Sequence, residues 1–94
     1  MLPKKLKLMA DYQCFPLWGD GDNIDPASLP ISDRLCEDLM TWALAFDATL
    51  VMDDPLSSAF PTGADELEFK REGQRLRDRL QTELGARSFV SLVV

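Results

Sequence analysis

The chain contains no histidine, and this absence excludes more chemistry than any other feature of its composition. Without an imidazole there is no Ser-His-Asp or Cys-His nucleophile, no histidine general base and no zinc site of the common types. The two cysteines, Cys14 and Cys36, are too few for a disulfide framework, and we expect both to be buried free thiols. The scattered glycines form no phosphate-binding loop. The composition therefore favours a binding protein, without cofactor or metal, over an enzyme.

Long apolar runs are also missing, since no stretch approaches the roughly 20 residues of a membrane span. The first five residues carry positive charge, but no apolar core of a signal peptide follows them. We therefore expect a cytoplasmic protein. The length of 94 residues fits one domain over residues 1–94, and 46% hydrophobic with 28% charged residues is ordinary for a globular chain.

Positive charge is nearly absent from the middle of the chain. Residues 8–69 contain 13 acidic side chains and a single basic one, Arg34, whereas the net charge of the whole chain is only −6. Such a field repels nucleic acid and anionic membranes and attracts basic surfaces. The charge distribution therefore predicts a basic protein partner. Asp-rich loops that serve only solubility would give the same pattern.

The first half of the chain predicts a strand, a long irregular segment and a helix. Residues 4–10 alternate polar and apolar side chains, which is typical of a half-buried strand. Residues 11–29 are rich in proline, glycine and aspartate and are expected to be irregular. Ser32 is a favourable N-cap for a helix that fades at residues 47–49. Its apolar positions recur at three- and four-residue spacing and should face the core: Leu35, Leu39, Trp42 and Phe46.

The second half predicts a helix over residues 64–84 and a closing strand over residues 88–94, whose apolar side chains would suit burial on both faces. Acidic residues early in this helix and basic residues later match the helix dipole, and Gly85 is a natural C-cap. Gly73, on the apolar side of the helix, suggests a close crossing with another element. The expected fold is α/β (α+β), a two-layer β-loop-α-loop-α-β domain. Its two terminal strands share one sheet, and residues 50–52 could add a short third strand.

Two acidic loops are the candidate binding residues. Residues 20–25 begin like a calcium-binding EF-hand loop, but Ile24 and Asp25 stand where a ligand and a glycine are required, so we expect turns rather than a metal site. Asp53 and Asp54 precede a proline in the second loop. They would form one patch with Asp11 and Asp22 if the two loops meet at the same end of the sheet.

Two aromatic residues, Tyr12 and Trp18, lie in the first irregular segment among these carboxylates. Aromatic side chains in such a segment usually close the open side of a small core. The alternative is a binding surface, because aromatic rings beside carboxylates suit the Arg or Lys side chains of a partner. Both interpretations stay open at this point.

Several short strings over most of the chain resemble a family of small acidic bacterial proteins: Lys7-Leu8-Met9-Ala10-Asp11-Tyr12, Pro16-Leu17-Trp18, Asn23-Ile24-Asp25-Pro26, Asp53-Asp54-Pro55, Ser57-Ser58 and Phe60. Members of that family are similar to the immunity proteins that accompany polymorphic or contact-dependent bacterial toxins. The resemblance implies an antidote that acts by binding, and it names no specific toxin.

We therefore predict a non-enzymatic immunity protein whose acidic loops cover a basic surface of a cognate toxin domain, nucleases being one class of such domains. Two alternatives stay open: a homodimeric adaptor or housekeeping protein whose residues 89–94 pair across chains, and a small carboxylate-dependent enzyme. The residues expected to form the binding face are Asp11, Tyr12, Trp18, Asp20, Asp22, Asp25, Asp53 and Asp54.

Overall fold

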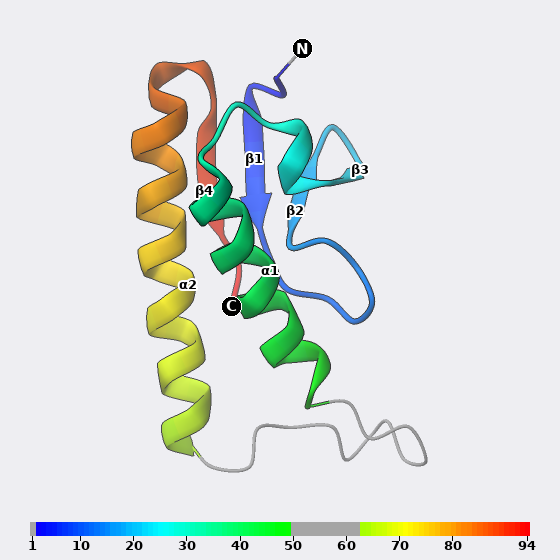
Figure 1. Ribbon diagram of the computed structural model, residues 1–94, viewed down its shortest axis with the longest axis vertical. Coiled ribbons are helices and arrows are strands. Elements are labelled where there is room, and N and C mark those ends of the chain that lie inside the picture. Colours follow the sequence, from blue (N-terminus) through cyan, green and yellow to red (C-terminus); the bar gives the residue numbers. More distant parts are fainter. Residues whose placement is uncertain (1, 50–62) are drawn as a thin grey trace.

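The computed structural model describes residues 2–49 and 63–94, which form a four-stranded sheet and two long helices (Figure 1). The two helices pack on one face of the sheet, which confirms the predicted two-layer α+β class. Neither of them is long and apolar enough to cross a membrane. In chain order the elements are β1 (Lys5–Leu8), β2 (Leu17–Gly19), β3 (Asp22–Ile24), η1 (Pro26–Ser28), α1 (Asp33–Asp47), α2 (Gly63–Leu84), η3 (Gly85–Arg87) and β4 (Phe89–Leu92).

The two terminal strands, β1 and β4, pair side by side in one sheet, as predicted. The strand order is β3-β2-β1-β4, and β1 runs parallel to β4 and antiparallel to β2. Alternation along β1 sends Leu6 and Leu8 into the core and leaves Lys5 and Lys7 exposed on the uncovered face. Leu6 stands opposite Val90 of β4, and both are buried. This pair fixes the register because a slip by one residue would expose both side chains.

The prediction that residues 11–29 are irregular was wrong, because they contain the β2–β3 hairpin and the short helix η1. The hairpin turn is Asp20-Gly21, with φ of 53° and 82°, and such two-residue turns twist as the flanking strands require. Asn23 supports the hairpin through its side chain, which donates to the carbonyls of Phe15 and Leu17 at 2.7 and 3.0 Å. Each strand has only three residues, too few to show a clear alternation in the sequence.

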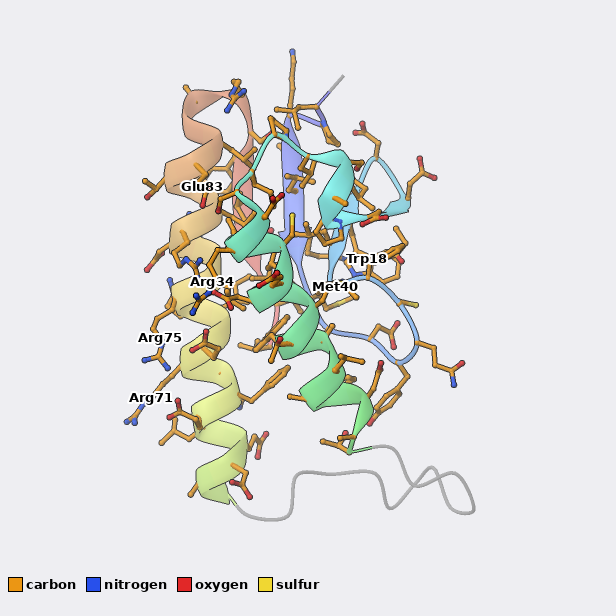
Figure 2. The ribbon with its side chains drawn as sticks, viewed as in Figure 1. Trp18, Arg34, Met40, Arg71, Arg75 and Glu83 are labelled. Atoms are coloured by element: carbon orange, nitrogen blue, oxygen red, sulfur yellow. The ribbon has the colours of Figure 1, made fainter. Side chains whose placement is uncertain are left out.

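The first helix begins and ends where its sequence predicts. The Ser32 hydroxyl accepts a hydrogen bond from the Leu35 backbone N–H at 3.2 Å, which satisfies one of the unpaired donors at the helix start. Glu83 of α2 in turn accepts hydrogen bonds from the Ser32 backbone N–H and hydroxyl at 2.6 and 2.9 Å (Figure 2). This cap therefore also ties the start of α1 to the end of α2.

The closing strand β4 differs from the prediction on one face. Val90 is fully buried, but Phe89 is 61% exposed because no helix covers that side of the sheet. The outer edge of β4 is covered by side chains of α2. Gln81 accepts from the Val90 backbone N–H at 2.9 Å, and Arg77 donates to the Val90 carbonyl at 2.9 Å. These bonds occupy groups that a second chain would need for edge-to-edge pairing. The predicted short strand at residues 50–52 lies outside the described residues.

Candidate functional site

Three of the candidate carboxylates surround the β2–β3 hairpin. Asp20 occupies the first position of the turn, Asp22 begins β3, and Asp25 follows that strand. The Asp25 carboxylate accepts a hydrogen bond from the Ala27 backbone N–H at 2.9 Å and so caps η1. All three are exposed, and none forms an ion pair with a basic residue in the described part of the chain. Asp25 therefore holds a local turn in place, and all three carboxylates present negative charge that no described basic residue compensates.

Asp11 is the remaining candidate carboxylate among the described residues, and it lies in the loop between β1 and β2. Its Oδ1 accepts the Tyr12 backbone N–H at 2.8 Å, and the side chain is exposed and without an ion pair to a described residue. Asp47, at the end of α1, holds the same loop by accepting from the Gln13 backbone N–H at 3.0 Å. The loop is therefore fastened to α1 while Asp11 stays free to meet a partner.

The two candidate aromatics, Tyr12 and Trp18, are held by ring stacking or by hydrogen bonds of their polar atoms. The Tyr12 ring stacks on Phe46 with centroids 4.6 Å apart, and its hydroxyl is 3.1 Å from the Thr49 hydroxyl. The Trp18 indole N–H donates to the Met9 carbonyl at 3.0 Å, and the ring lies on the side of α1 away from α2 (Figure 2). Both residues are half-buried. Neither residue belongs to the buried core, so their core-closing role and their contact with a partner both stay predictions.

The hairpin aspartates and Asp11 lie at different ends of the sheet. Asp20 and Asp22 share a surface depression with Pro3, near the start of β1, whereas Asp11 follows the end of β1. The expected single patch of Asp11 and Asp22 is therefore not present, because β2 runs back along β1 and carries the hairpin turn to the opposite end. The β2–β3 hairpin and the loop between β1 and β2 still both lie on the side of the sheet away from α2 (Figure 1). Asp53 and Asp54 lie outside the described residues.

A second acidic surface lies between the two helices, where α1 and α2 diverge (Figure 1). The cleft there has a volume of about 580 Å³, within the usual range of ligand sites. Its floor is the stacked pair Trp42 and Phe69, with centroids 4.4 Å apart and an interplanar angle of 6°. The Trp42 indole N–H donates to the Phe69 carbonyl at 2.9 Å. The cleft therefore has a fixed aromatic floor.

Gly73 makes this floor possible, as its place on the apolar side of the second helix suggested. A Cβ atom at this position would stand 2.8 Å from Cζ2 of Trp42, closer than real side chains approach. Trp42 is 3% exposed and is held by its hydrogen bond to α2, so the ring has little room to move. The glycine thus lets the indole reach the backbone of α2.

Four carboxylates line the cleft: Asp38 from α1, and Asp65, Glu68 and Glu72 from α2. Asp38 accepts from Arg79 at 2.7 Å and from Arg34 at 3.3 Å. The hydrogen bond from Arg79, with the nearby Arg34, holds the pKa of Asp38 below its usual value. Glu68 and Glu72 both meet the guanidinium of Arg75 in α2, at 3.0 and 2.9 Å. These ion pairs fix the carboxylates in place.

Sequence reasoning missed these cleft residues, although a signal was present. Asp65, Glu68 and Glu72 recur at spacings of three and four, which places them along one side of a helix. By itself, the acidic early turn of this helix indicates only a match to the helix dipole. The spacing could have identified the row, but not the apolar floor beside it, because Trp42 and Phe69 are 27 residues apart.

The described residues contain no group of three cysteine, aspartate or glutamate side chains that could hold a metal ion. Cys14 and Cys36 are free and half-buried, rather than fully buried as expected. Burial, together with the carboxylate of Asp33, raises the pKa of the Cys36 thiol. The thiol therefore remains protonated at neutral pH, which disfavours a role as nucleophile. Among the described residues, the loop carboxylates and the acidic cleft are therefore the candidate binding groups.

Comparison with known protein families gives one match that spans nearly the whole chain. Residues 4–93 match the family described as Serratia CdiI immunity protein-like. No match is found among curated proteins. The match includes every described strand and both helices, together with the hairpin and the cleft. The chain therefore belongs to the Serratia CdiI immunity protein-like family, a family of immunity proteins of contact-dependent growth inhibition.

Proposed function

We propose that this chain is an immunity protein that binds a cognate contact-dependent inhibition toxin in the cytoplasm and neutralises it. The family match over residues 4–93 carries this proposal. Neutralisation by binding needs a preformed complementary surface and no turnover. The exposed loop carboxylates and the acidic cleft, carried by the packed sheet and helices, support this proposal.

The charge of the molecule supports a basic toxin domain as the partner, with nucleases as one such class. Asp11, Asp20, Asp22 and Asp25 are exposed and have no ion pair with a described residue, so their charge extends into solvent. Carboxylates of this kind attract a basic surface at a distance and raise the association rate. We assign this steering role to the loop carboxylates, to which Asp53 and Asp54 would add. Tyr12 and Trp18 would support the loops from beneath and contact the partner with their exposed edges.

Co-expression tests the proposal. The toxin domain encoded by the reading frame immediately upstream is expressed in a susceptible host, with and without this chain. We expect growth arrest by the toxin alone and normal growth when this chain is present. The purified pair should form a complex whose affinity falls steeply as salt rises. Growth arrest that this chain does not relieve, or the absence of a complex at low salt, would contradict the proposal.

A further inference from the structure

We propose that the cleft between α1 and α2 is the docking site for a lysine- or arginine-bearing segment of the toxin, one long basic side chain of which enters the cleft. This inference rests on the proposed function, because it assigns that partner to a particular surface. The hairpin carboxylates lie on a different side of the domain, so the two surfaces can be tested separately (Figure 1).

The shape of the cleft fits the stem of a long side chain. Its floor is the flat Trp42–Phe69 stack, and its α1 wall consists of the small residues Thr41, Ala45 and Ala48. A lysine or arginine can lay its methylene groups on such a surface while its charged end stays near water. The pair of aromatic rings also attracts a cation. An apolar floor beneath a charged rim therefore suits an amphipathic side chain.

The charge of the lining selects the sign of that side chain. Four of the described lining residues are carboxylates, and none of the described lining residues is basic. The arginines that pair with Asp38, Glu68 and Glu72 are not part of the lining. They fix the geometry of three rim carboxylates before a partner arrives, so binding requires little further ordering. A cation entering the cleft would meet carboxylates from both helices.

An exposed leucine borders the cleft, as expected of a docking surface for a protein segment. Leu44 is 61% exposed, and it lies three residues after Thr41 and four before the C-cap residue Ala48, both of which line the cleft. Residues three and four apart are neighbours on a helix surface. A partner seated on the cleft would therefore cover Leu44 as well. This extra contact favours a segment of a protein over a free small cation.

A series of substitutions at Ala45 tests whether the toxin side chain enters the cleft and whether that side chain is positively charged. Ala45 is exposed and lines the cleft, and alanine, lysine, glutamine and glutamate are all good helix formers, so the variants should fold. The affinity of the purified upstream toxin domain is measured for Ala45→Lys, Ala45→Gln and Ala45→Glu by surface plasmon resonance. Ala86→Lys, an exposed position in η3 that does not line the cleft, serves as the matched control.

We expect Ala45→Lys to weaken binding by about a hundredfold or more, because a like charge then stands where the toxin cation must enter. Ala45→Gln should weaken binding less, and Ala45→Glu should bind more tightly than Ala45→Gln. The control should stay within about twofold of the wild type. Equal losses for the three Ala45 variants would indicate an apolar occupant, and the reverse order would indicate an acidic one. Either result would overturn the proposal, as would wild-type affinity in all three variants.

The outcomes for the cleft and for the proposed function are separable. If the wild-type chain forms no complex with the toxin domain, the proposed function fails. If it binds and rescues growth but the Ala45 series shows no dependence on charge, only the cleft proposal fails. Light scattering of each free variant identifies the remaining possibility. A change of mass in Ala45→Lys alone would show that the cleft contacts a second copy of this chain, which would also overturn the proposal.

Discussion

The molecule carries two classes of carboxylate, those of the loops and those of the cleft, which are held in different ways. Around the loops, Asp11, Asp20, Asp22 and Asp25 are exposed and have no ion pair with any described residue. In the cleft, Asp38, Glu68 and Glu72 are fixed by arginines above an aromatic floor. The loop charges are thus uncompensated and project into solvent, whereas those of the cleft are partly compensated and ordered.

This difference assigns a different part of binding to each surface. Uncompensated exposed charge acts over a distance of about a Debye length and mainly affects the rate of association. An ordered cleft with an apolar floor contributes after contact and mainly affects the rate of dissociation. We therefore expect the loops to bring the toxin to this chain and the cleft to retain it.

Among substitutions outside the cleft, neutralising the loop charges should have the largest effect on toxin binding. Replacing Asp11, Asp20, Asp22 and Asp25 with asparagine keeps the turns, because asparagine tolerates the positive φ at position 20 and caps η1 as aspartate does. Association at low salt should slow by about 10- to 100-fold, with a flatter dependence on salt. Stopped-flow mixing at several salt concentrations measures both. The ion-paired surface residue Asp78 is the control, and Asp78→Asn should change the rate little. An unchanged salt dependence in the fourfold variant would argue against steering by the loops.

Adding a methyl group beneath the cleft should deform its floor without touching the loops. Gly73→Ala places a Cβ atom 2.8 Å from the Trp42 ring, so we expect unfolding to become easier by about 1–3 kcal/mol, as is typical of overpacking. Urea denaturation measures this change. The toxin should also dissociate faster while its association rate is unchanged. Gly63→Ala, where an added Cβ atom would meet no atom of the described residues within 4 Å, is the matched control and should have little effect. Stability equal to that of the wild type in Gly73→Ala would show that the ring can move aside.

Exposing the edge of β4 should affect assembly but not toxin binding. In Gln81→Ala the Val90 backbone N–H loses its hydrogen-bond acceptor. We expect this to lower the free energy of unfolding by about 1 kcal/mol. With Arg77→Ala added, both outward groups of Val90 become available for pairing between chains. Analytical ultracentrifugation should then detect concentration-dependent association that the wild type lacks. If toxin binding changes as strongly as in the cleft variants, β4 belongs to the interface and the assignment to two surfaces is incomplete.

The ion pairs of Asp38 should make the free energy of unfolding depend slightly on pH. Because its pKa is lower in the folded chain, Asp38 stabilises the fold fully above the ordinary carboxyl pKa of about 4. That contribution is lost as the pH falls through the lowered value. The difference in unfolding free energy between wild type and Asp38→Asn should therefore be greatest near neutral pH and shrink below pH of about 4. Removing the main hydrogen-bond donor with Arg79→Gln should abolish most of this pH dependence. A difference that grows on acidification would contradict the assignment.

Local patterns in the sequence were enough to predict most of the layered fold. The alternation of Lys5, Leu6, Lys7 and Leu8 located β1, and Ser32 located the start of α1. Gly73 indicated a close crossing, and the structure shows that the Trp42 ring lies there. Each of these signals depends on neighbours in the chain or on one strong steric requirement.

The two surfaces could not be predicted to the same extent, because they depend on contacts between distant residues. The β2–β3 hairpin consists of strands too short to show a period, and its turn separates Asp22 from Asp11. The cleft requires Trp42 and Phe69 to stack while α1 and α2 diverge, and no local pattern contains that geometry. The charge distribution and the fold class were therefore predictable from the sequence. The cleft, in which carboxylates surround an apolar floor, was not.

The rate constants of the two classes of variant, measured with the same toxin domain, test the division between the two surfaces most directly. The loop variant, Ala45→Lys and their combination are compared by surface plasmon resonance at low and high salt. We predict slower association with little change in dissociation for the loop variant, and the opposite for Ala45→Lys. In the combination the two effects should add as free energies, because the surfaces are separate. Faster dissociation in the loop variant, or slower association as the main defect of Ala45→Lys, would contradict the account.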